Sequence, residues 1–187
     1  MSLLTTPSQT VGPYLRIGFT PLAVDKIAPP RAPGEHLTIE GRVFDGDGKP
    51  VSDAVLEIWQ ADSSGKYADV AGKPARAGGF RGFGRILTDA GGVFRFTTIK
   101  PGAVPGPGGA TQAPHLVVTL FMRGLLKHMI TRLYFPDDPG NAGDAVLLLV
   151  PVERRTTLIA RRSAQAKATL QWNVVLQGEN ETVFFDY

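Results

Sequence analysis

The chain has 187 residues, 43% of them hydrophobic and 20% charged, with a formal net charge of +3, which is typical of one globular domain with a sizeable core. Because the sequence contains no cysteine, disulfides, thiolate metal sites and cysteine nucleophiles are excluded. The basic residues are scattered, the apolar runs are too short for a membrane span and the first residues lack the pattern of a signal peptide, so we expect a cytoplasmic protein that binds neither nucleic acid nor membrane.

The first 35 residues are rich in proline, glycine and threonine and show no hydrophobic periodicity. Proline restricts the backbone and stiffens an extended segment, and a segment without its own core becomes ordered by docking. We therefore predict an N-terminal arm over residues 1–35 that docks on a partner chain.

The remaining residues, 36–187, are predicted to form a β-sandwich. The chain carries 22 glycines and 15 prolines, and short apolar segments alternate with turn sequences such as DGDGKP at 45–50 and TDAGG at 88–92. Strands are expected at 36–43, 54–60, 93–99, 115–122, 129–135, 145–150, 169–176 and 181–186, and a short helix at 153–162. The fold class is therefore all-β: an antiparallel β-sandwich with an extended N-terminal arm and one short helix.

Few side chains suggest chemistry on their own. The three histidines, His36, His115 and His128, are not spaced so that two of them could bind one ion locally, although His115 and His128 could still meet across neighbouring strands. No serine nucleophile motif and no phosphate-binding loop is present. Arg132 lies in an apolar strand, where it either forms an internal salt bridge or reaches an anion in a cleft.

Several longer motifs occur in an order that is informative. They are TPSQTVGPY (6–14), LEIWQAD (56–62), SGKY (64–67), GRILTD (84–89), FTTIKPG (96–102), RLYF (132–135) and TVFFDY (182–187). Together they cover nearly the whole chain and resemble the intradiol ring-cleavage dioxygenases. The resemblance is strongest to members that act on 3,4-dihydroxybenzoate (protocatechuate) as a pair of related chains, alpha and beta.

In that family, ferric iron is bound by two tyrosines and two histidines, a donor set that suits a hard ferric ion. One tyrosine follows the KPG motif, both histidines lie in PAHxH, and the other tyrosine lies between WQA and GRxLTD. Here Val104 follows the KPG motif, His115 matches the first histidine, Val117 replaces the second, and no tyrosine occurs between Ala68 and Phe83. The resemblance therefore implies that this chain has no catalytic or metal-binding residue and that Fe(III) is bound by a homologous beta chain in a hetero-oligomer.

The resemblance also implies which residues of this chain contribute to the substrate pocket. Thr10, Gly12, Pro13 and Tyr14 are expected to form part of the wall of the partner's pocket, and Arg132 is expected near it, as a cation that favours an aromatic acid. The implied reaction is cleavage of 3,4-dihydroxybenzoate by O₂ to 3-carboxy-cis,cis-muconate. The alternative is a stand-alone β-sandwich interaction module without catalysis, because many small sandwich domains share the same turn sequences.

Overall fold

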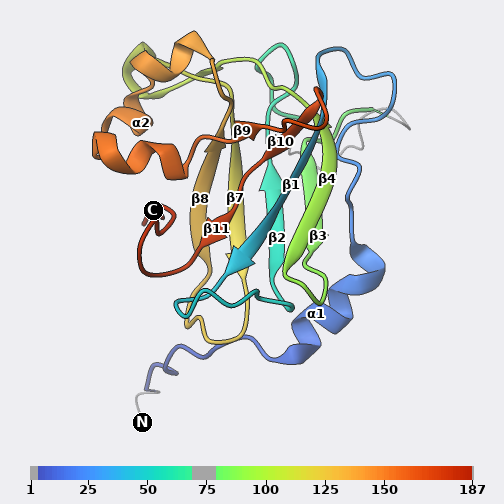
Figure 1. Ribbon diagram of the computed structural model, residues 1–187, viewed down its shortest axis with the longest axis vertical. Coiled ribbons are helices and arrows are strands. Elements are labelled where there is room, and N and C mark those ends of the chain that lie inside the picture. The colour runs from blue at the N-terminus through green and yellow to red at the C-terminus, as the bar shows by residue number, and fades with distance from the viewer. Residues whose placement is uncertain (1–3, 69–78, 187) are drawn as a thin grey trace.

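The computed structural model describes residues 4–68 and 79–186 of the chain, and the structural statements below refer to these residues. Two sheets stack face to face as a β-sandwich, and a small two-stranded ribbon lies beside them (Figure 1). The predicted all-β sandwich is therefore confirmed. None of the helices in the described ranges has the length and apolar character needed to cross a membrane.

The first sheet is built around its longest strand, β1. On one side β1 pairs with β4 in antiparallel orientation, and on the other side it pairs in parallel with two short strands, β10 and β11. The sheet is therefore mixed. Its strands are β1 (His36–Phe44), β4 (Val93–Ile99), β9 (Arg161–Arg162), β10 (Thr169–Gln171) and β11 (Val174–Val175).

The second sheet has four antiparallel strands in the order β3-β2-β7-β8. They are β2 (Val55–Trp59), β3 (Phe83–Leu87), β7 (His115–Phe121) and β8 (Met129–Tyr134). The separate ribbon pairs β5 (Val104–Pro105) with β6 (Thr111–Gln112), and a 3-10 turn, η2 (Pro107–Gly109), connects them.

The main core lies between the two sheets and follows from the alternation along their strands. On β7, Leu116, Val118 and Leu120 are buried in this core, and on β8 Leu133 joins them. Burying one such side chain contributes about 1.5–3 kcal/mol. Because alternate residues face opposite sides, His115 and its neighbours on the other face of β7 lie on the outer side of the second sheet.

The turns between strands follow a common local pattern. Asp45, Asp62 and Asp89 each accept backbone N–H groups from residues two and four positions later through one carboxylate oxygen, at 2.8–3.0 Å. An aspartate carboxylate can replace a turn hydrogen bond in this way. The turns predicted at 45–50 and 88–92 are thus confirmed.

The strand predicted at 145–150 is wrong, since these residues contain a helical turn, α2 (Ala145–Leu148). The Asp144 carboxylate accepts the N–H groups of Val146 and Leu147, at 3.0 and 2.8 Å, and so caps the helix. The expected helix at 153–162 is present as a shorter 3-10 helix, η4 (Val152–Thr157), and another 3-10 turn, η3 (Pro139–Gly143), precedes α2.

Two other strand predictions also need correction. The strand expected at 169–176 is divided into β10 and β11, and the chain between them passes so close to β1 that a Cβ atom on Gly41 would lie 1.7 Å from the Trp172 carbonyl oxygen. Only glycine permits such an approach. Residues 181–186 form no strand and make a single isolated bridge, between Phe185 and Ile130. Strand β3 was not predicted.

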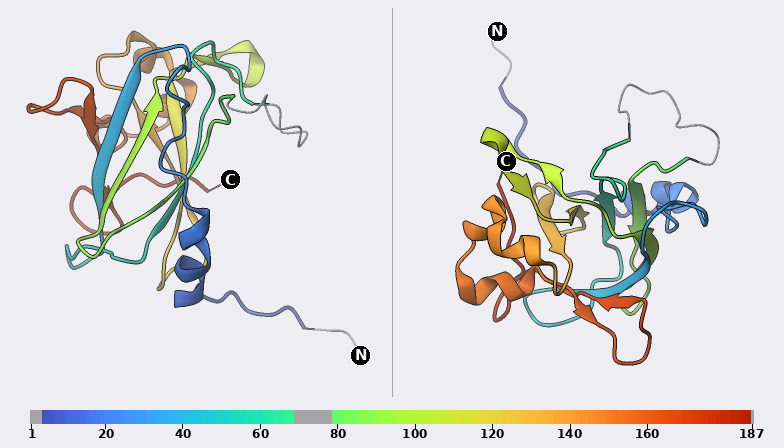
Figure 2. Two further views of the ribbon diagram at one scale, coloured as in Figure 1. Left: turned by 90° about the vertical axis from the view of Figure 1, so that its right-hand side faces the viewer. Right: turned by 90° about the horizontal axis from the view of Figure 1, so that it is seen from above.

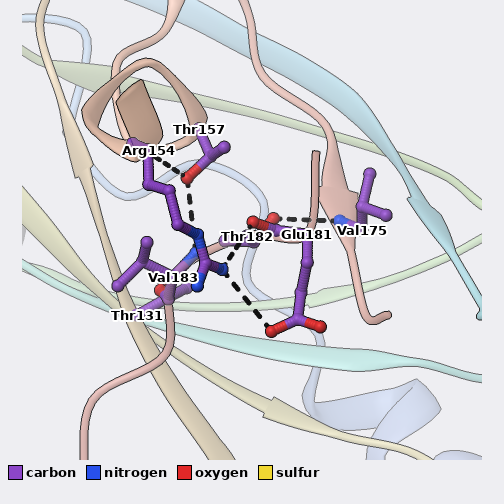
Figure 3. Close-up of polar contacts among 7 residues, drawn as sticks. All are labelled: Thr131, Arg154, Thr157, Val175, Glu181, Thr182 and Val183. Atoms are coloured by element: carbon purple, nitrogen blue, oxygen red, sulfur yellow. Dashed lines mark hydrogen bonds and ion pairs between the residues drawn. The ribbon is translucent and has the colours of Figure 1, made fainter. Parts of the chain in front are cut away.

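The C-terminal tail, residues 179–186, covers the free edge of β8. The Thr131 hydroxyl donates to the Val183 carbonyl at 2.7 Å, and the Phe185 N–H donates to the Ile130 carbonyl at 2.7 Å. Figure 3 shows Thr182 between this edge and β11, where its hydroxyl accepts the Val175 N–H at 2.9 Å. An edge strand exposes unpaired backbone groups, and the tail pairs with one of them, the Ile130 carbonyl.

The predicted N-terminal arm contains a short helix, α1 (Pro13–Phe19), followed by the 3-10 turn η1 (Thr20–Leu22). Figure 2 shows α1 beside the sandwich. Residues 23–35 return to the sandwich, where the Ile27 N–H donates to the Thr97 carbonyl at 2.9 Å and the Ile27 side chain is buried in the core.

Candidate functional site

The outer face of the second sheet brings together the residues that the metal-site motif would use. Strand pairing places Trp59 opposite Val117, and Val117 opposite Arg132. His115, two residues before Val117 on β7, is opposite Tyr134 on β8. Paired residues point to the same side of a sheet, so these five side chains form two adjacent rows on one face.

His115 is held by its own chain. Its Nδ1 lies 2.7 Å from the Ala113 carbonyl oxygen, and because a carbonyl can only accept, Nδ1 carries the hydrogen. The ring is buried and lies 5.8 Å from the Tyr134 ring, centroid to centroid. Burial lowers the pKa of His115, and the nearby Arg132 charge lowers it further, while the Ala113 hydrogen bond and the Asp144 charge oppose the shift.

Arg132 is buried, with only 8% of its surface exposed. Its Nη1 donates to the Gln112 side-chain oxygen at 2.7 Å and to the Tyr134 hydroxyl at 3.4 Å. Both of these acceptors are neutral side chains on the outer face. The structure thus places Arg132 beside His115 rather than on an exposed surface.

Asp144, the residue before α2, also belongs to this group, because it contacts Tyr134. It is fully buried, and its carboxylate accepts the Tyr134 hydroxyl at 3.0 Å and the Ala113 N–H at 2.8 Å, in addition to capping α2. Burial raises the pKa of Tyr134 well above its usual value, which keeps the phenol protonated as a donor. We call His115, Arg132, Tyr134, Asp144 and Gln112 the outer-face cluster.

The outer-face cluster does not fit the ferric ion of the dioxygenase motif. Val104 and Val117 offer no donor atom, and the Arg132 guanidinium next to His115 would repel a cation. Within residues 4–68 and 79–186, no three histidine, aspartate or glutamate side chains form a group that could bind a metal ion. One imidazole without further donors is too weak a site for iron.

An aromatic pair lies next to the cluster. The rings of Tyr67 and Trp59 stack with an angle of 7° between their planes and a centroid distance of 6.3 Å. Burial raises the pKa of Tyr67, and the positive charge of Arg132 opposes this shift, which places Tyr67 within electrostatic reach of the cluster. Sequence reasoning did not predict this pair. The alternation along β2 could have indicated it, because Trp59 faces away from the buried Leu56 and Ile58.

The other predicted pocket residues lie on the arm. Thr10 accepts the Gly124 N–H through its hydroxyl at 2.8 Å, Gly12 precedes the first turn of α1, and Pro13 begins the helix. Tyr14 is 81% exposed. Gly124 lies in the loop between β7 and β8, whereas Arg132 pairs with Val117 farther along these strands, so one chain does not bring the arm residues and Arg132 into one pocket.

Asp144 and Gln112 were also missed by sequence reasoning. An aspartate directly before an apolar run is a helix N-cap signal, but the run AVLLLV suggested a buried strand instead. Gln112 offers no comparable local signal, because its role depends on Arg132 from another strand.

Comparisons with known proteins point to the same family as the sequence motifs. A family model described as Dioxygenase matches residues 12–178. The chain is 46% identical to a protocatechuate 3,4-dioxygenase alpha chain from Burkholderia cepacia, over 99% of this chain and 98% of that protein. It is 36% identical to a protocatechuate 3,4-dioxygenase beta chain from the same species, over 80% of this chain and 67% of that protein.

A solved structure shares the fold as well. It is the dioxygenase domain of a dioxygenase and carbohydrate-binding protein fusion from Streptomyces sp. SirexAA-E, 29% identical, with a TM-score of 0.64 over 85% of this chain and 88% of that chain. The family and the similarity to alpha chains that the motifs predicted are therefore confirmed. The chain belongs to the intradiol ring-cleavage dioxygenase family, whose members in general depend on iron.

Proposed function

We propose that this chain is the alpha subunit of a protocatechuate 3,4-dioxygenase, paired with a related beta chain that binds the catalytic Fe(III). The proposal rests on one combination: similarity to alpha chains over nearly the whole length, together with a sequence that offers no ligand at three of the four positions that bind iron in the family it resembles. The assembled enzyme cleaves 3,4-dihydroxybenzoate with O₂ to 3-carboxy-cis,cis-muconate. A cytoplasmic location remains a prediction from the sequence.

In this proposal the arm and the sandwich have different tasks. The sandwich, residues 36–187, is the scaffold, and the arm, residues 1–35, docks on the beta chain. Thr10, Gly12, Pro13 and Tyr14 form part of the wall of the partner's substrate pocket, and we call residues 10–14 the wall segment. The exposure of Tyr14 supports this role, because its phenol is available to another chain.

Arg132 contributes in a different way. Its guanidinium is buried and contacts Gln112 and Tyr134, so we propose that it favours the anionic substrate through its electrostatic field. A fixed charge near a pocket raises the local concentration of a ligand of opposite sign. This role requires the outer-face cluster to lie near the partner's pocket in the assembly.

Co-expression with a related beta chain tests the proposed function. We expect a stoichiometric complex that takes up O₂ with 3,4-dihydroxybenzoate, whereas the purified single chain shows no ring cleavage and no tyrosinate–iron colour. A coloured, active single chain would overturn the proposal. A chain that remains monomeric beside the beta chain would instead support the stand-alone interaction module.

A further inference from the structure

The helix α1 has two faces with different surroundings. Arg16 and Phe19 are partly buried against the sandwich, whereas Tyr14 and Ile17 are 81% and 59% exposed. Residues three positions apart share a helix face, so Arg16 and Phe19 form one face while Tyr14 and Ile17 form another. The first face is attached to this chain, and the second is presented outward.

Arg85 on β3 is the main attachment point of the arm. Its Nε and Nη2 donate to the Glu57 carboxylate at 2.8 and 2.6 Å, which holds the guanidinium in place. The Phe19 ring covers this guanidinium, with its centroid 4.2 Å from Cζ. The backbone of Arg85 also exchanges two hydrogen bonds with Val24, at 2.8 and 3.0 Å, so the arm is attached on both sides of η1.

Two further contacts attach the arm on either side of Tyr14. The Arg16 Nη2 donates to the Thr88 carbonyl at 3.0 Å, and the Thr10 hydroxyl accepts the Gly124 N–H at 2.8 Å. Tyr14 therefore lies between two contacts to the same sheet: one at the end of β3 and one in the loop between β7 and β8. In Figure 1 the chain passes below the lower ends of the strands before it reaches α1.

The anchors are needed because α1 cannot hold its own conformation. A helix of seven residues is too short to be stable by itself in water. The Gly12 N-cap provides no side-chain hydrogen bond, and no residue of α1 is buried in the core. Contacts to Arg85 and Thr88 therefore determine where the helix lies, and with it the direction in which Tyr14 points.

We propose that Arg16, Phe19 and Arg85 are positioning residues for the substrate pocket, because they hold the wall segment where it meets the partner's pocket. This inference rests on the proposed function. These residues need not touch the substrate. They reduce the number of conformations of the wall segment before binding, so less conformational entropy is lost when the substrate is bound.

Kinetics of the co-expressed complex test this inference. The variant Phe19→Ala removes the ring over Arg85, and we expect the KM for 3,4-dihydroxybenzoate to rise about threefold to tenfold, as loss of a cation–π contact allows. The kcat per bound iron and the visible spectrum should stay unchanged. The separate variant Phe19→Tyr keeps a ring over the guanidinium, so its KM should equal that of the wild type. Val152→Ala serves as the control, because Val152 is 70% exposed and lies on η4, away from the arm.

Hydrogen exchange of the arm provides a second measurement. In Phe19→Ala the amides of residues 13–22 should exchange faster, while those of β2 and β7 should be unchanged. An unchanged KM, or a complex that no longer forms while arm exchange stays the same, would overturn the positioning role. Failure of the wild-type chain to bind any beta chain would reject the proposed function instead, so the two failures are distinguishable.

Discussion

The outer-face cluster and the N-terminal arm both lie outside the main core, but they use their side chains in different ways. In the cluster, Arg132, Tyr134 and Asp144 contact one another and the neighbouring backbone, and all are buried. On the arm, Tyr14 and Ile17 point outward and remain exposed. The cluster therefore stabilises this chain, whereas the outward face of the arm is available to a second chain.

The C-terminal tail has an irregular backbone like the arm. Its polar groups, however, are hydrogen-bonded within the chain like those of the cluster. Arg154 donates to the Glu181 carbonyl at 3.1 Å, and Thr182 pairs with Val175 through both its N–H and its hydroxyl (Figure 3). Irregular backbone thus does not by itself indicate a partner. What distinguishes the arm from the tail is the exposure of large apolar side chains such as Tyr14 and Ile17.

The largest change in the free energy of unfolding is expected for a substitution in the outer-face cluster. In Asp144→Ala, the Tyr134 hydroxyl and three backbone N–H groups lose a buried acceptor, so the free energy of unfolding should fall by about 3 kcal/mol or more. Urea unfolding of the full chain measures this change. Asp47→Ala is the control, because 76% of the Asp47 side chain is exposed, and it should change the value by less than about 0.5 kcal/mol. Equal changes in the two variants would contradict this view of the cluster.

A smaller loss of stability is expected for a substitution in the C-terminal tail. Thr182 is buried, and Thr182→Val removes the hydroxyl that accepts the Val175 N–H while keeping the shape of the side chain. The free energy of unfolding should fall by about 1–3 kcal/mol, because a buried donor loses its partner. The same substitution at the exposed Thr97 on β4 is the control. If both valine variants unfold at the same urea concentration, the tail is attached by its backbone alone.

The pH dependence of stability tests the state of His115. Its pKa in the folded chain is lowered, so below about pH 6.5 the unfolded chain takes up a proton that the folded chain does not, and stability should fall as the pH falls through this range. Urea unfolding at pH 7.5 and 5.5 measures the difference. His115→Asn should make it smaller, and His128→Asn, at an exposed position, should leave it as in the wild type. An undiminished difference in His115→Asn would show that other groups cause it.

The smallest effect on stability is expected at Tyr14. Because this side chain is 81% exposed, Tyr14→Ala should change the free energy of unfolding of the single chain by less than about 0.5 kcal/mol. In the assembled enzyme the same variant should raise the KM for 3,4-dihydroxybenzoate. Leu149→Ala, at an equally exposed position in the sandwich, should change neither quantity. A marked loss of stability in Tyr14→Ala would remove the difference between arm and cluster.

Local patterns predicted the sheets better than the connections. The alternation around Val55 and Val93 and the aspartate turns correctly indicated strands and turns, because these depend on neighbouring residues. The run after Asp144 was misread, because an apolar segment of this length suits a strand or a helix and the N-cap decides between them. The break at Trp172 depends on Gly41, which is distant in the sequence.

The sequence by itself determined which chemistry this chain lacks, since valines at positions 104 and 117 cannot bind iron whatever the fold. It also determined the sandwich, through the period of its apolar residues. Only the tertiary structure decided that Arg132 is held by Gln112 and Tyr134, and that Phe19 rests on Arg85. These contacts join residues from different strands and segments, and their partners are specified by strand pairing and packing rather than by any local pattern.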